Sequence, residues 1–210
     1  MSANKVKFNL KNVHAAKLTV DNSGGYTYAT PQAIPGAVSL SLDSEGDMTP
    51  FYADGQIYYR SVSNNGYSGD LEIALIPEWF KTDILKEELD DNGVLVETNE
   101  DPTPVYFALL FEVDGDAHSV RRVFYNCSVS KRPTIESSTK QETVEPGTET
   151  LSITADPRAD GLVKCSTGDT TATATYNNWY RSVYVPSITE ESGGGSGSGG
   201  SGSGSDTPAG

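Results

Sequence analysis

Histidines and clustered carboxylates are the side chains in this chain that could do chemistry. The 210 residues include only two histidines, His14 and His118, far apart in the chain. Acid–base and nucleophilic catalysis both need a titratable group held next to the reacting group. Residues 1–191 contain none of the patterns G-x-S-x-G, G-x-x-x-x-G-K-[ST], G-x-G-x-x-G and H-E-x-x-H. The sequence therefore predicts no enzyme, no catalytic residues and no cofactor.

Acidic residues beside glycine are the second candidate, as ligands of a hard cation. They are Asp43, Glu45 and Asp47 around Gly46, and Asp114 and Asp116 around Gly115. Neither group has EF-hand spacing, and turns ordinarily use acidic residues next to glycine. Cys127 and Cys165 also lack the spacing of a zinc site. We expect no bound metal, and we expect both cysteines to be small buried residues.

The net charge of −14 at pH 7 is unevenly distributed. Residues 61–116 carry 14 acidic and 2 basic side chains, whereas residues 1–60 carry 5 of each. Nucleic-acid affinity comes from clustered Lys and Arg that release counterions from phosphates. The pattern argues against a nucleic-acid-binding protein but is compatible with nucleic acid passing by unbound. A plain acidic surface that maintains solubility would give the same pattern.

A strand followed by a helix is predicted within residues 64–97. Residues 70–76 alternate, with Leu71, Ile73 and Leu75 on one face. Pro77 ends this strand and suits the first turn of a helix, where its missing N–H is not needed. The helix would pack on the sheet through one apolar side, made of Trp79, Phe80, Ile84, Leu85 and Leu89. The segment 91–93, Asp-Asn-Gly, would then end the helix or form a turn.

Residues 43–69 form a long polar connection that contains pairs of aromatic residues. Asp54-Gly55 predicts a hairpin tip between residues 50–52 and 57–59. Long connections in compact domains usually have a function. The candidate contact residues on this hairpin are Phe51, Tyr52, Ile57, Tyr58 and Tyr59. The alternative is that these rings fold back onto the protein's own core.

The remaining segments predict an antiparallel β protein. Residues 5–12 alternate with Val6, Phe8 and Leu10 on one face, and residues 37–42 with Val38, Leu40 and Leu42. Residues 105–113 are apolar on both faces and predict a central buried strand. Residues 120–129 would return beside it with Val123, Tyr125, Cys127 and Val129 inward. Residues 132–144 and 148–157 would form the next pair, followed by a short strand at 161–165. Residues 173–186 would make a helical turn that brings Trp179 and Tyr180 onto the core.

One domain over residues 1–191 is expected, followed by a Gly/Ser-rich extension or linker at 192–210 that cannot order itself. The amino terminus has no apolar signal segment, and no run approaches the ~20 apolar residues of a membrane span. We therefore expect a protein made in the cytosol with no membrane association.

Several stretches together resemble one family. They are AIPGAVSLSLDSEGDMTPFYADG (33–55), NNGYSGDLEIALIPEWFKTDILKEELDDNGVLVE (64–97), FALLFEVDGD (107–116), ETLSITADPRADGLVK (149–164) and YNNWYRSVYVP (176–186). The chain is similar over residues 6–186, in collinear order, to the major tail proteins, or tail tube proteins, of siphovirus-type long-tailed bacteriophages and prophages. Only the Gly/Ser extension departs from the family pattern.

This resemblance implies an antiparallel β-sandwich or barrel-like tail tube fold with one α-helix and a long projecting hairpin. It implies a virion protein, made in the host bacterial cytoplasm, that forms hexameric rings stacked into a tube for DNA ejection. By the same resemblance, the partners are other copies of the chain, the tape measure protein, the tail terminator and distal tail or baseplate proteins. DNA would pass through the bore without specific binding. The hairpin at 43–60 is our candidate for the contact between rings.

Two other readings of the sequence remain open. A monomeric β-sandwich module for carbohydrate or receptor binding would use the exposed tyrosines as sugar platforms. A tube protein of a contractile injection system would have a similar fold. A hydrolase is a distant alternative that no motif supports.

Overall fold

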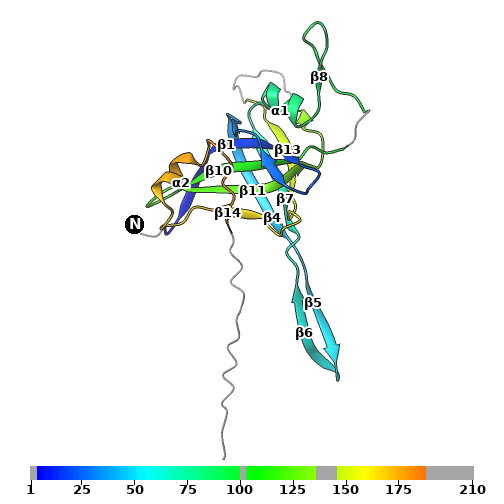
Figure 1. Cartoon of the computed structure of the whole chain (residues 1–210), viewed down its shortest axis with the longest axis vertical. Coiled ribbons are helices and arrows are strands. Elements are labelled where there is room, and N and C mark those ends of the chain that lie inside the picture. The colour runs from blue at the N-terminus through cyan, green and yellow to red at the C-terminus, as the bar shows by residue number, and fades with distance from the viewer. Residues whose placement is uncertain (1–3, 100–102, 136–145, 188–210) are drawn as a thin grey trace, which may run out of the picture.

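The computed structural model describes residues 4–99, 103–135 and 146–187, and nearly half of these residues lie in antiparallel strands (Figure 1). The strands are β1 (Lys7–Val20), β2 (Tyr26–Tyr28), β3 (Gln32–Ala33), β4 (Ala37–Glu45), β5 (Met48–Ala53), β6 (Gln56–Val62), β7 (Gly66–Ile73), β8 (Glu88–Leu89), β9 (Leu95–Val96), β10 (Phe107–Gly115), β11 (Val120–Val129), β12 (Thr134–Ile135), β13 (Glu149–Ala155) and β14 (Lys164–Ser166). The helices are α1 (Glu78–Asp83) and α2 (Thr173–Asn178). The predicted mainly-β class is confirmed. The Gly/Ser-rich segment 192–210 and most of the strand predicted at 132–144 lie outside the described residues.

One large sheet forms the body of the protein. Its strand order is β2-β1-β10-β11-β13-β7-β4, and every neighbouring pair is antiparallel. The short strands β3, β12 and β14 pair with β1, β13 and β11. β1 and β4 lie near opposite ends of this order, yet both contact the same hydrophobic core. The sheet is therefore rolled into a sandwich-like barrel that is not closed between β1 and β4.

Strand β10 supplies side chains to two cores. Phe107, Leu109 and Phe111 belong to the inner core, which the rolled sheet encloses. Ala108 and Leu110 belong to the outer core, on the other side of the sheet. Successive strand residues point to opposite faces, so a strand that is apolar at every position must be covered twice. The prediction of a central strand at 105–113 is confirmed, and burying each large side chain contributes about 1.5–3 kcal/mol.

Each core has a helical cover. The inner core is covered by α1 and the turn after it, where Phe80, Ile84 and Leu85 are buried. The Phe80 ring packs edge-on against Phe107 with 5.5 Å between ring centroids. The outer core is covered by the segment after α2, where Trp179 is buried. This confirms the expected helical turn at 173–186, and Figure 1 shows α1 and α2 over different parts of the sheet.

The helix that begins after Pro77 is shorter than predicted, and the inclusion of Leu89 in its packing face is wrong. α1 ends at Asp83, and Lys86 has a positive φ of 60°, which turns the chain out of the helix. Leu89 consequently lies in the small β8–β9 hairpin and is exposed. Trp79 is half-buried against the inner core, as the prediction requires. The prediction of one helix is also incomplete, because α2 is a second one.

Backbone irregularities explain why three predicted inward residues face solvent. Val6 directly precedes β1 and Phe8 lies at its start, and both are exposed because register shifts at Asn9 and Asn12, with φ of 58° and 53°, interrupt the alternation. In β4, a register shift after Ala37 leaves Val38 exposed, while Leu40 and Leu42 pack on the inner core.

Three further side chains are placed differently from the prediction. β7 ends at Ile73, so Leu75 is exposed and Ile76 takes the buried place. In β11, one inward face was expected for Val123, Tyr125, Cys127 and Val129. Val123 and Tyr125 lie in the outer core, whereas Cys127 and Val129 pack in the inner core, because β11 is buried on both faces and its register with β10 shifts nearby.

Candidate assembly surfaces

The predicted hairpin is present and projects far from the body (Figure 1). β5 and β6 pair antiparallel, and Asp54 and Gly55 at the tip have φ of 52° and 76°. Two adjacent positive φ angles are those of a type I′ turn, which Asp-Gly favours. The prediction of a tip at these residues is confirmed.

The hairpin continues the β4–β7 strand pair. Backbone hydrogen bonds join Asn65 N to Glu45 O at 2.8 Å and Ser63 N to Asp47 O at 3.1 Å, between the two ladders. Because hydrogen bonds bridge the junction, the hairpin is an extension of the sheet and not a loose loop.

The aromatic rings of the hairpin do not fold back onto the core. The exposed fractions are 61% for Phe51, 62% for Tyr52, 73% for Tyr58 and 64% for Tyr59. Ile57, the fifth predicted contact residue, is 42% exposed. The alternative that the rings pack on their own protein is therefore wrong for this structure.

Both faces of the hairpin carry exposed apolar side chains. The register places Tyr52 opposite Ile57 on one face and Phe51 opposite Tyr59 on the other. The first face also carries Met48 and Val62, which the sequence prediction did not include. A two-stranded hairpin is marginally stable alone, and protein interfaces are rich in aromatic residues and Met. Arg60 also lies on the first face and Thr49 and Ser61 on the second, but a hairpin with large apolar side chains on both faces is suited to contact with protein on two sides.

A second surface, which we call the acidic face, covers the outer side of β4, β7 and β13. The register forms the rows Ser39–Glu72–Thr150, Ser41–Asp70–Ser152 and Asp43–Ser68–Thr154, with Glu45 beyond them. The hydroxyls bind the carboxylates: Ser39 Oγ donates to Glu72 Oε2 at 2.9 Å, and Ser152 Oγ donates to Asp70 Oδ1 at 2.8 Å. None of these three strands contains a lysine or arginine. The acidic face therefore presents hydroxyls and uncompensated negative charge to solvent.

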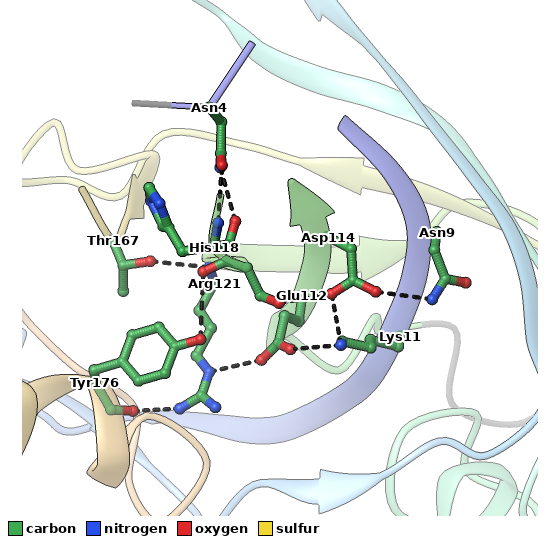
Figure 2. A network of polar contacts seen from close by, with 10 residues as sticks. Asn4, Asn9, Lys11, Glu112, Asp114, His118, Arg121, Thr167 and Tyr176 are labelled. Carbon is green, nitrogen blue, oxygen red and sulfur yellow. Dashed lines mark hydrogen bonds and ion pairs between the residues drawn. The ribbon is translucent and has the colours of Figure 1, made fainter. Parts of the chain in front are cut away.

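A polar network joins β1, β10, β11 and α2 (Figure 2). Arg121 Nε donates to Oε2 of the buried Glu112 at 2.7 Å. The guanidinium carbon of Arg121 lies 3.7 Å from the centre of the Tyr176 ring. Figure 2 shows Lys11 between Glu112 and Asp114, with its Nζ 3.4 Å from Glu112 Oε1. The buried charges are paired, so this network fixes strands and a helix to one another and leaves no free acid or base.

The candidate cation ligands around Gly115 are occupied by the protein itself. Asp114 accepts hydrogen bonds from Asn9 Nδ2 at 2.9 Å and Ser119 Oγ at 2.6 Å. Asp116 Oδ1 accepts from the backbone N–H of Lys5 at 2.7 Å. Among residues 4–99, 103–135 and 146–187, no three His, Cys, Asp or Glu side chains form a cluster that could hold a metal ion.

The two histidines are separate from each other. His14 stacks on Tyr180, with 4.5 Å between ring centroids, and its Nδ1 is 2.9 Å from Asn12 O. His118 Nε2 lies 3.1 Å from Asp169 Oδ1. Neither imidazole adjoins a serine or cysteine nucleophile in these contacts.

Comparison with protein-family models and with curated proteins finds no match for this chain. The resemblance to tail tube proteins is therefore an expectation from the sequence that these comparisons do not test. Neither helix in the described part of the chain has the length and apolar character needed to cross a membrane.

The sequence located the hairpin but missed the acidic face and the Arg121 network. The signal for the acidic face was present as serines and acids alternating along residues 39–45 and 68–72. The sequence did not show that β13 pairs with β7, which places residues 150–154 beside residues 68–72.

Replacing Asp114 by asparagine should flatten the acid dependence of stability. Hydrogen bonds from Lys11, Ser119 and Asn9 lower the pKa of Asp114 from 3.8 to about 2. A carboxyl with a lowered folded pKa stabilises the fold above its unfolded pKa, and this contribution is lost as pH falls from about 4 to about 2. The slope of the unfolding free energy against pH, measured by denaturant titration, gives the number of protons taken up when the protein unfolds. Between pH 2 and pH 4, Asp114→Asn should lower this number by up to about one.

The control for this prediction is Asp91→Asn, which changes an exposed carboxylate in the turn between β8 and β9. It should leave the dependence on pH close to that of the wild type. Equal acid slopes for the wild type and Asp114→Asn would contradict the assigned role of the Lys11 contact.

Proposed function

We propose that this chain is the structural subunit of the tail tube of a siphovirus-type phage. Copies close into rings, six being the number that the family resemblance favours, and the rings stack into a tube through which DNA leaves. The subunit works by association and not by catalysis.

The observation that carries the proposal is the exposed hairpin with apolar side chains on both faces. Exposed apolar surface of this kind marks a protein contact, and here it lies on a stiff extension of the sheet. A binding platform for sugars would need aromatic rings on one accessible face only. Rings on both faces of a narrow ribbon favour a hairpin that neighbouring subunits cover from two sides.

The acidic face supports the conduit role. A bore that conducts DNA must not bind it, because each favourable phosphate contact would slow movement. The face combines Asp43, Glu45, Asp70 and Glu72 with hydroxyl side chains and without cations from its three strands. We assign it to the lining of the bore.

The proposed location is the virion tail, after assembly in the host cytoplasm. The proposed partners besides further copies are the tape measure protein, the tail terminator and distal tail or baseplate proteins. The related role in a contractile injection system would use the same surfaces.

Electron microscopy of the purified full-length chain over a concentration series tests the proposal. We expect rings or rods, and a reconstruction at side-chain resolution should place Asp70 and Glu72 on the bore. A species that stays monomeric at millimolar concentration would overturn the proposal. A bore lined by lysine and arginine would overturn the conduit role.

A further inference from the structure

A cavity of about 350 Å³ opens on the side of the barrel that is not closed, between β1 and β4. We call it the mouth. Its apolar lining includes Leu42 of β4, Phe111 of β10 and Phe124 of β11. Phe111 and Phe124 are themselves buried, and Leu42 is half-buried beside them, so the base of the mouth is apolar. Its volume is at the lower end of the range of about 300–1,000 Å³ for ligand pockets, which suits a few side chains.

The charged residues that line the mouth are all cations. They are Lys7, Arg122 and Lys164, and no carboxylate is among the lining residues. Lys164 Nζ lies 4.1 Å from the centre of the Tyr67 ring. Arg122 Nε is buried and has no hydrogen-bond partner in the described part of the chain. The Arg122 side chain as a whole is only half-buried, and a carboxylate on a bound group would give its guanidinium a charged hydrogen-bond acceptor.

We propose that the mouth receives the tip of the β5–β6 hairpin from a second copy of this chain, with the Asp54 carboxylate directed at Arg122. This rests on the proposed function and names the surface that the hairpin binds.

Charge and chemistry select this occupant. Asp54 is the sole charged residue between positions 49 and 59, and apolar Tyr52 and Ile57 lie close to it. The tip therefore offers one anion carried on an apolar body, which complements a cationic rim over an apolar floor. Figure 1 shows the hairpin directed away from its own body, so the tip belongs in another copy.

The proposed contact joins two different surfaces, a tip and a mouth. Such a heterologous contact leaves one free tip and one free mouth at the ends of every oligomer that has not closed into a ring. It consequently propagates into rings or filaments, in agreement with a tube subunit.

Arg122→Met separates this role from a structural one. Below the assembly concentration, the melting temperature should be unchanged or higher, because the substitution removes a half-buried cation whose Nε has no hydrogen-bond partner in the described part of the chain. The concentration for half-maximal assembly should rise at least about tenfold, because the Asp54 partner is lost. Lys17→Met, which removes an exposed cation elsewhere on β1, should change neither quantity.

Cross-linking provides a readout that does not depend on the energetics. Full-length Asp54→Cys protein is mixed with full-length Lys7→Cys protein under mild oxidation, and the disulfide-linked dimer is measured. The matched control replaces Lys7→Cys by Lys17→Cys, also exposed and on the same strand. The native Cys127 is fully buried and Cys165 is half-buried, so the wild-type chain sets the background.

We expect at least fivefold more dimer with Lys7→Cys than with Lys17→Cys. If the Lys7→Cys and Lys17→Cys mixtures give equal dimer yields while the wild-type chain still forms rings or rods, the mouth is not the receptor and the proposed function stands. A wild-type chain that never assembles would overturn both.

Discussion

Replacing Phe51, Tyr52, Tyr58 and Tyr59 together by serine is expected to abolish tube assembly while leaving the body folded. These rings are 61–73% exposed, so their loss removes few contacts within the subunit. At an interface, aromatic side chains are the commonest hot spots, each costing about 2 kcal/mol or more when truncated. Four such losses together are comparable to the binding free energy of about 8 kcal/mol that corresponds to a micromolar Kd.

Thermal melting followed by circular dichroism and negative-stain imaging measure the two halves of this prediction. The melting temperature should stay within a few degrees of the wild type, and rings or rods should disappear. A control with Thr49→Ser and Gln56→Ser changes polar residues of the same hairpin and should assemble normally. If the variant with all four serines forms normal tubes, the hairpin is not the contact that drives assembly.

Local patterns were sufficient to predict those parts of the fold that short-range physics decides. Strand β10 is apolar at every position from Phe107 to Phe111, and only a strand covered on both faces accommodates that pattern. The hairpin tip follows from Asp54-Gly55 because few residue pairs tolerate two positive φ angles. In both cases a few neighbouring residues carry the whole signal.

Register shifts escaped prediction because their causes are not local in the sequence. Asn9 and Asn12 adopt positive φ where β1 bends along β10, and the alternation of Val6 and Phe8 no longer reports which face is inward. Lys86 likewise ends a helix whose apolar spacing continues to Leu89. Apolar period predicts a face only while the backbone remains regular.

The candidate surfaces divide in the same way. The hairpin is contiguous in the sequence, so its aromatic residues could be named before the structure was known. The acidic face is assembled from β4, β7 and β13, whose pairing joins residues separated by more than a hundred positions. The mouth depends on the gap between β1 and β4, which no sequence pattern marks.

A large loss of stability from a single small change is expected for Gly66→Ala, where the hairpin joins the body. Gly66 is buried with φ of 99°, and an added Cβ would lie 2.0 Å from the backbone oxygen of Ala155. Ala155 lies in β13, which is paired with both β7 and β11 and cannot retreat without breaking those ladders. We expect a loss of about 3 kcal/mol or more, because strain and a backbone clash act together.

Gly161→Ala is the matched control for this substitution. Gly161 has φ of 81°, so alanine there is strained in a similar way, but nothing lies within 4 Å of the added Cβ. Its cost should be about 1–2 kcal/mol, that of a left-handed alanine alone. Urea unfolding of both variants measures the difference, which isolates the clash with Ala155. Equal losses would mean that β13 yields at this point, and the hairpin would then be attached to a movable strand and not held at a fixed angle to the barrel.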